Sequence, residues 1–277
     1  MRISLPKLLQ YHSRIQSISH TGFKVKILPA LQDNYMFLIM DEKTKTAGVI
    51  DPVEPAKVLE AVHDEDVDLT TVLMTHHHWD HAGGNKELLS THKHLKVFGF
   101  GDHIFGVNHK VTHNCTLNLG SLYLKCLFTP CHTMDHISYY IDNKDDPALF
   151  SGDTLFLGGC GRFFEGTGED MYNSLINVIS KLPGNTKVYC GHEYSVSNLL
   201  FAVHSQPNNK NAIKKLEWAK KQRIDGIPTI PSTLEEEFLY NPFLCVNKKN
   251  MQRRYKTDNG IETMTALRLD KDNFKSS

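Results

Sequence analysis

The chain has 277 residues, with 31 basic and 31 acidic side chains and a formal net charge of zero. This length can bury a sizeable core in one large domain or two. The balanced charge gives no electrostatic reason to expect a nucleic-acid partner, and no apolar run approaches the length of a membrane span. The six cysteines are scattered without CxxC spacing or a secretory leader, which indicates reduced intracellular thiols.

Residues 1–22 carry basic and serine side chains but no acidic residue. This composition is typical of a mitochondrial targeting segment, and the alternative is an untargeted, poorly ordered tail. We therefore expect the protein in the mitochondrial matrix, the cytoplasm or both.

The next part of the chain alternates between short apolar runs and helical patterns. Strands are predicted over residues 25–28, 35–40, 47–50, 70–74, 96–100, 117–128, 138–141, 148–150 and 187–190, and helices over 54–64 and 85–90. Two strand-rich halves with helices between them predict an α/β sandwich, with the sheets inside and the helices outside.

The pattern changes to mainly helical after residue 192. Helices are predicted over residues 196–204, 210–223 and 234–238, with a capping box from Ser232 to Glu235. We therefore divide the chain into a tail or targeting segment (1–22), a strand-rich domain (23–192) and a smaller, mainly helical domain (193–277).

The stretch THHHWDH, residues 75–81, directly follows the predicted strand 70–74. In extended backbone His76 and His78 point to the same side, and Asp80 and His81 follow as the chain curls into a helix. Imidazole nitrogen and carboxylate oxygen are ligands for zinc and related divalent ions.

Three later stretches repeat this arrangement, in which a strand-like run ends in a turn-forming residue and a His or Asp. They are residues 128–136, 149–155 and 188–194, which contain His132, Asp153 and His192. Four strand ends with ligand chemistry can converge on one edge of a sheet, so we predict a metal centre there.

The motifs THHHWDH, PCHT, SGDT and CGHEY, in this order, resemble the metallo-β-lactamase superfamily, and within it the glyoxalase II (hydroxyacylglutathione hydrolase) family. The similarity extends from about Phe23 to Lys275 and includes LPALQDNY at residues 28–35 and RLDKD at residues 268–272. It implies the metallo-β-lactamase αββα sandwich as the catalytic domain (23–192), and a smaller helical C-terminal domain (193–277) that binds substrate.

The resemblance also implies how the ligands divide between two divalent metal ions. Zinc is the expected metal, and the same ligands also accept iron or manganese. His76, His78 and His132 would hold one ion, Asp80, His81 and His192 the other, and Asp153 would bridge them. Two such ions can lower the pKa of a shared water from about 15.7 toward about 7, giving a hydroxide nucleophile. Asp80 and Asp153 are therefore the predicted catalytic residues. A closed structural zinc site, which favours four ligands and cysteine, fits this set poorly.

Substrate contacts are implied in the same way for Arg162, Phe164, His192, Tyr194, Arg268 and Lys271. Glutathione carries two carboxylates, which suit Arg and Lys. The family more often has lysine at position 162 and tyrosine at 164, so Phe164 lacks one hydroxyl and a modest loss of affinity is expected. Met134-Asp135 replaces a small pair, and nothing in the sequence explains that change.

The implied activity is hydrolysis of S-2-hydroxyacylglutathione, such as S-lactoylglutathione, to glutathione and a 2-hydroxy acid, the last step of methylglyoxal detoxification. The expected partner is this small-molecule thioester, and we expect a monomer. The alternatives are a glutathione persulfide dioxygenase with a single iron, and a non-catalytic metal- or glutathione-binding protein.

Residues beside the ligands are given simpler roles. His77 is predicted to be structural, His136 to support the site without binding metal, and Trp79 to serve packing rather than catalysis. Cys131 and Cys190 are predicted to be small buried residues.

Overall fold

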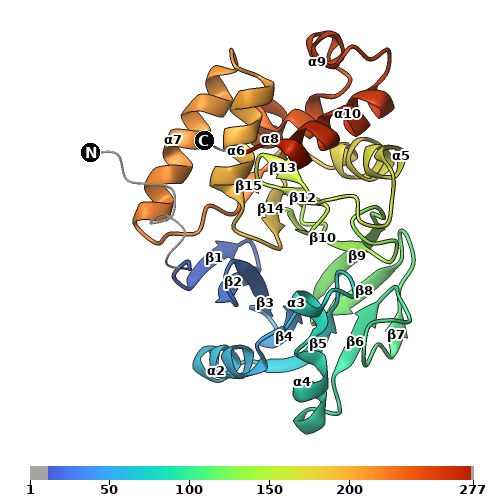
Figure 1. Ribbon diagram of the computed structural model, residues 1–277. Helices are drawn as coiled ribbons and strands as arrows, with labels where there is room; N and C mark the ends of the chain where they lie inside the picture. Colours follow the sequence, from blue (N-terminus) through green and yellow to red (C-terminus); the bar gives the residue numbers. More distant parts are fainter. Residues whose placement is uncertain (1–11, 276–277) are drawn as a thin grey trace.

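A computed structural model describes residues 12–275 and shows two mixed β-sheets packed face to face (Figure 1). The first sheet has the order β1 (Gln16–His20), β2 (Phe23–Ala30), β3 (Asn34–Asp41), β4 (Thr46–Ile50), β5 (Asp68–Leu73), β6 (Lys96–Gly99) and β7 (His109–Lys110). The second has the order β15 (Ser232–Thr233), β14 (Lys187–Cys190), β11 (Ala148–Gly152), β10 (Ile137–Ile141), β9 (Leu122–Phe128) and β8 (Thr116–Leu119). Strands β12 (Leu155–Phe156) and β13 (Gly159–Cys160) form a separate hairpin.

Alternation of side chains along the strands creates the layers. In β3, Tyr35 and Phe37 point into the core between the sheets, where they meet Phe150 of β11. Met36 and Leu38 point the other way, into a core shared with α2 (Pro55–Glu65) and α4 (Asn85–Thr91). A strand that is buried on both faces reads as a continuous apolar run, as residues 35–40 do.

The outer face of the second sheet is covered by helices from later in the chain. Leu127, Tyr140, Leu149 and Val188 of this sheet pack against α5 (Gly168–Tyr172) and α10 (Gly260–Asn273). The remaining helices are α3 (Trp79–Ala82), α6 (Ser195–Ser205), α7 (Lys210–Ile224), α8 (Leu234–Tyr240) and α9 (Lys249–Tyr255), with shorter turns at Asn173–Val178, Ile179–Lys181 and Pro242–Cys245. Figure 1 shows α2 and α4 at the bottom of the view and α6 to α10 at the top. The predicted αββα sandwich is confirmed.

The strand directions place the candidate site. Strands β4 and β5 run parallel in one sheet, and β11 and β14 run parallel in the other. Asp51, His76, Asp153 and His192 follow these four strands within three residues of their ends. Side chains from both sheets therefore meet at the carboxyl ends of parallel strands, the usual position of ligand sites in such sheets.

Three predictions about the fold are corrected by the structure. Residues 16–20, placed in the tail, form the edge strand β1, which pairs along β2; residues 1–11 of the predicted targeting segment lie outside the described residues. The predicted strand 117–128 is a hairpin of β8 and β9, because Gly120 adopts a positive φ of 59° at the turn.

The third difference concerns the capping box before α8, which lies one residue later than predicted. Thr233 caps the helix by accepting from the Glu236 N–H, and the Glu236 carboxylate accepts from the Thr233 N–H. Ser232 is instead paired with Val188 in β15 and donates to Glu237. This strand joins the C-terminal part of the chain to the second sheet.

Among residues 12–275, no helix has the length and apolar character needed to cross a membrane.

Candidate metal centre and adjoining cavity

Three histidines form the first ligand group. Nε2 of His76 and Nε2 of His132 each lie 3.1 Å from Nδ1 of His78. The far nitrogens of two rings are already engaged, since Nδ1 of His76 donates to Thr75 Oγ1 and Nδ1 of His132 donates to the Arg162 carbonyl. Both Nε2 atoms therefore direct lone pairs to one point, an arrangement that suits a cation.

Asp80, His81 and His192 form the second group. Nε2 of His81 and Nε2 of His192 lie 3.2 Å apart, and both lie about 3.5 Å from Asp80 Oδ2, at 3.6 and 3.5 Å. Asn34 orients Asp80 by donating to its Oδ2 and to its backbone carbonyl. One ion can be bound by all three side chains.

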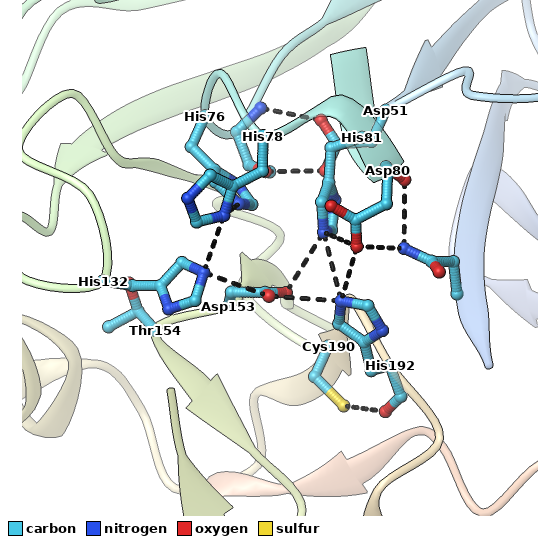
Figure 2. A network of polar contacts seen from close by, with 12 residues as sticks. Asp51, His76, His78, Asp80, His81, His132, Asp153, Thr154, Cys190 and His192 are labelled. Atoms are coloured by element: carbon cyan, nitrogen blue, oxygen red, sulfur yellow. Dashed lines mark hydrogen bonds and ion pairs between the residues drawn. The ribbon is translucent and has the colours of Figure 1, made fainter. Parts of the chain in front are cut away.

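Asp153 lies between the two groups (Figure 2). Its Oδ2 is 3.4 Å from His132 of the first group and 3.2 Å from His192 of the second, and its Oδ1 is 3.5 Å from His81. Oδ1 is buried and has no hydrogen-bond partner among the described residues. A buried carboxylate oxygen without a donor is costly unless a cation compensates it, so the donor set fits two adjoining metal ions.

Asp51 belongs to neither group but is hydrogen-bonded to His81 of the second group and, through Thr75, to His76 of the first. Its Oδ2 accepts from His81 Nδ1 at 2.9 Å and from Thr75 Oγ1 at 2.6 Å, and Thr75 Oγ1 in turn accepts from His76. Its Oδ1 accepts from the Thr75 N–H. Asp51, His76 and His81 are close enough to hold an ion themselves, but both Asp51 oxygens are already occupied. We therefore assign Asp51 to orienting the histidines, as carboxylates beside metal-binding histidines commonly do.

Two further residues orient ligands in the same way. Asp33 Oδ1 accepts from His192 Nδ1 at 2.8 Å. His136 accepts from the Asp153 N–H at 3.1 Å, and burial lowers the pKa of His136 to about 3, so the ring is neutral. His136 thus contacts the site without joining either ligand group.

Charge differs between the two groups. Burial lowers the pKa of His76 well below its ordinary value and also lowers that of His78 and His132, which leaves three neutral rings. In the second group burial also acts to lower the histidine pKa values, but the Asp153 carboxylate outweighs it. The pKa of His81 is raised well above its ordinary value and that of His192 to about 9. A divalent ion would displace those protons, because metal-binding histidines must be neutral.

A cavity of about 600 Å³ opens over the metal centre and contains the predicted substrate contacts. Its lining includes Arg162, Phe164, His192, Tyr194, Arg268 and Lys271. The Phe164 ring lies 5.1 Å from His132, and the Tyr194 ring stacks on His192 at 4.6 Å. The centre and the predicted cations therefore face the same space.

Some cavity residues had not been singled out in the sequence. Phe156, Cys160, Ser197 and Asn198 also line the cavity, and Asp33, Asn34 and Asp51 orient the ligands. Asp33 and Asn34 lie in the LPALQDNY motif, which had marked the family without suggesting a role for either residue. Asp51 directly follows the predicted strand 47–50, and only that position at a strand end could have pointed to a role in the site.

The predictions for the flanking residues have mixed outcomes. The predicted packing role of Trp79 is wrong: its side chain is 73% exposed and lines the cavity, because the ligands on either side turn inward. His77 lies outside both ligand groups and contacts Asp135. Cys131 and Cys190 are buried, as predicted, and burial raises the pKa of both thiols.

Comparisons with known proteins agree with this arrangement. The family described as hydroxyacylglutathione hydrolase C-terminus matches residues 193–274, and the metallo-beta-lactamase superfamily matches residues 31–97. The chain is 49% identical over 255 residues to a hydroxyacylglutathione hydrolase-like protein of Gallus gallus, covering 91% of this chain and 90% of the relative. It is 47% identical over 256 residues to the cytoplasmic hydroxyacylglutathione hydrolase of Arabidopsis thaliana, covering 91% and 99%.

Among solved structures, ETHE1 from Myxococcus xanthus aligns with a TM-score of 0.66 and 25% identity, covering 95% of this chain and 92% of that one. Fold and site together define a member of the metallo-β-lactamase superfamily with His/Asp clusters able to bind metal. More narrowly, the chain belongs to the hydroxyacylglutathione hydrolase family. The resemblance inferred from the motifs is confirmed.

Proposed function

We propose that the protein hydrolyses S-2-hydroxyacylglutathione thioesters, such as S-lactoylglutathione, to glutathione and a 2-hydroxy acid. The observation that carries the proposal is the shared cavity, because one space is lined by members of both metal-ligand groups and by three basic side chains. Family membership supports the same reaction.

The ligand assignment follows the two groups. His76, His78 and His132 would hold one ion, Asp80, His81 and His192 the other, with Asp153 between them. Ions bound there supply Lewis acidity and a water of lowered pKa. Histidine and carboxylate donors accept zinc first, and also iron or manganese.

The protein side chains would bind and orient the thioester. Arg162, Arg268 and Lys271 offer positive charge to the two carboxylates of glutathione, and Tyr194 and His192 lie beside them on the cavity wall. The leaving thiol has a pKa near 8.5, so the thiolate departs without a dedicated general acid.

A decisive test of the reaction is hydrolysis of S-D-lactoylglutathione, followed at the thioester absorbance, with both products identified. We expect glutathione and D-lactate in equal amounts. Absence of turnover on protein that holds its metal would contradict the proposal.

A glutathione persulfide dioxygenase with a single iron is the second candidate. Such an enzyme could use the three-histidine group alone. The second group, with Asp80 drawn into it by Asn34, favours the hydrolase. Oxygen uptake with glutathione persulfide, without thioester hydrolysis, would favour the dioxygenase.

We also propose that the protein acts as a monomer on this small molecule, without a nucleic-acid or membrane partner, in the mitochondrial matrix, the cytoplasm or both. The Arabidopsis relative is named as cytoplasmic.

A further inference from the structure

Glu193 lies between two residues of the site, the metal ligand His192 and the cavity residue Tyr194, but it does not line the cavity itself. Its buried carboxylate accepts three hydrogen bonds, from the Tyr35 hydroxyl at 2.6 Å, from the Thr229 N–H at 3.0 Å and from the Thr229 hydroxyl at 2.8 Å. A buried polar group with its partners in place holds a single arrangement. Glu193 can therefore fix the backbone on either side of it.

The bond from Tyr35 is the last in a chain of hydrogen bonds that begins in α7. Arg223 of this helix donates to Ser13 Oγ at 2.7 Å. Ser13 in turn donates to the Tyr35 hydroxyl, because the hydrogen of that hydroxyl is directed to Glu193. All four side chains are buried, and in such a chain each bond strengthens the next. The chain joins α7, the segment before β1 and strand β3 to the loop that follows β14.

Thr229 extends this support to the start of α6. Its hydroxyl, which donates to Glu193, accepts from Ser195, the first residue of that helix. Tyr194 therefore lies between two anchored neighbours. Its ring stacks on His192 with an angle of 4° between the ring planes. Because the ring extends from this short piece of backbone, its place over His192 depends on the anchors on both sides.

His192 has separate partners of its own. Asp33 accepts from His192 Nδ1 at 2.8 Å, and Asn34 forms a β-bridge with His192. Neither contact involves the Glu193 carboxylate. Loss of the hydrogen bonds to Glu193 should therefore displace Tyr194 more than it displaces the metal ligand.

We propose that Glu193 is a positioning residue, which holds Tyr194 over the second ligand group in the orientation that meets the substrate. The inference rests on the proposed function, because it takes Tyr194 as a contact of the glutathione thioester. It predicts that a change at Glu193 alters substrate binding and leaves the metal in place.

Steady-state hydrolysis of S-D-lactoylglutathione by Glu193→Gln tests the inference. Glutamine has only one acceptor oxygen, and its amide group would meet the donors of Tyr35 and Thr229, so the arrangement is lost. We expect KM to rise at least about fivefold, as misplacement of a binding group implies, while kcat and metal content stay close to those of the wild type. Tyr35→Phe removes one of the three donors and should raise KM less.

Tyr189→Phe is the matched control for the tyrosine variant. Tyr189 is also buried between the sheets, but its hydroxyl contacts His20 rather than the loop after β14. This control should leave KM unchanged. A KM equal to that of the wild type in Glu193→Gln would overturn the inference, and so would a fall in metal content that accounts for the whole loss of activity.

A double-mutant cycle shows whether Glu193 acts through Tyr194. Tyr194→Ala should raise KM by itself, and adding Glu193→Gln should then raise it no further, because the residue to be positioned is absent. Increases in KM that add together would contradict the proposed route.

A crystal structure of Glu193→Gln separates this inference from the proposed function. We expect the Tyr194 ring to be displaced from His192 in the variant. A wild type that does not hydrolyse the thioester would refute the proposed function, and the ring position would then decide the inference alone. A Tyr194 ring still stacked on His192 in the variant would overturn it.

Discussion

The metal centre and the cationic wall of the same cavity are built in different ways. In the centre, the ring nitrogens that face away from the ligand groups have buried or half-buried partners. Nδ1 of His81 donates to Asp51, and Nδ1 of His192 donates to Asp33. The two arginines of the wall share one carboxylate instead: Asp272 Oδ1 accepts from Arg268 at 2.7 Å and lies 3.3 Å from Arg162 Nε. Arg162 is 58% exposed. The centre is thus held in place by partners outside it and suited to chemistry, whereas the wall includes the exposed Arg162, whose side chain can adapt to a bound molecule.

The largest effect should follow loss of a carboxylate ligand. Asp153→Ala or Asp80→Ala should lower turnover by more than about a thousandfold, beyond the usual cost of losing one electrostatic group. Asp153→Ala removes the carboxylate between the two ligand groups, and Asp80→Ala removes the carboxylate of the second group. Turnover and metal content are measured together. Asp145→Ala, an exposed carboxylate, is the control and should behave like the wild type. Near-normal turnover in a metal-depleted Asp153 variant would contradict the mechanism.

Neutralising Asp51, which orients the histidines, should weaken metal binding without removing a ligand. In Asp51→Asn the amide cannot accept all the hydrogen bonds that Thr75 and His81 now donate. We expect metal affinity to fall about 10- to 100-fold, measured by competition with a chelator. Asp41→Asn is matched, because Asp41 is also buried and accepts from Ser121 and Thr44 far from the metal. Equal affinities in the two variants would show that Asp51 has no orienting role.

The cationic wall should affect binding more than chemistry. Arg268→Ala should raise KM about 10- to 100-fold, since a hydrogen bond to a charged group contributes about 1.5–3 kcal/mol, with little change in kcat. Steady-state kinetics separate the two constants. Arg253→Ala, which removes an exposed arginine from α9, should change neither. A fall in kcat at constant KM would place Arg268 in the chemistry instead.

Binding should also weaken as pH rises. Burial and the nearby Arg268 charge lower the pKa of Lys271 to about 7. Lys271 is therefore charged below that pH and loses its proton above it, so attraction for a substrate carboxylate declines and KM increases through neutral pH. In Lys271→Met the KM should be higher and this dependence absent. A KM profile that is the same in both proteins would refute the role of Lys271.

The smallest effect concerns the hydroxyl that the family often has at position 164. Phe164 is 60% exposed on the cavity wall. Phe164→Tyr should lower KM about 2- to 10-fold, because one hydrogen bond contributes about 0.5–1.5 kcal/mol. Phe105→Tyr, at another exposed phenylalanine, is the control. An unchanged or raised KM in the Phe164 variant would mean that no substrate group is within reach.

The ligand-bearing motifs were predictable because each is local: an apolar strand, a turn and a His or Asp lie within a few residues. His76 and Asp153 needed only the general rule that parallel strand ends meet at one edge. The family resemblance then divided the ligands into two sets, and the structure brings those same residues together.

The residues that orient the ligands could not be predicted, because their roles depend on contacts between distant segments. Asp51 reaches His81 across 30 positions and Asp33 reaches His192 across 159. Strand β1 was missed because its polar, half-buried sequence has the composition of a tail and gains its order by pairing with β2. Trp79 was assigned a packing role, whereas the ligands on either side of it determine its exposed position.

The most direct test of the account is a metal titration of the metal-free protein, with hydrolysis of S-D-lactoylglutathione measured at each step. The two adjoining ligand groups predict that activity rises until the second equivalent is bound and is constant beyond it. Full activity at one equivalent, or none at two, would contradict a dinuclear thioester hydrolase.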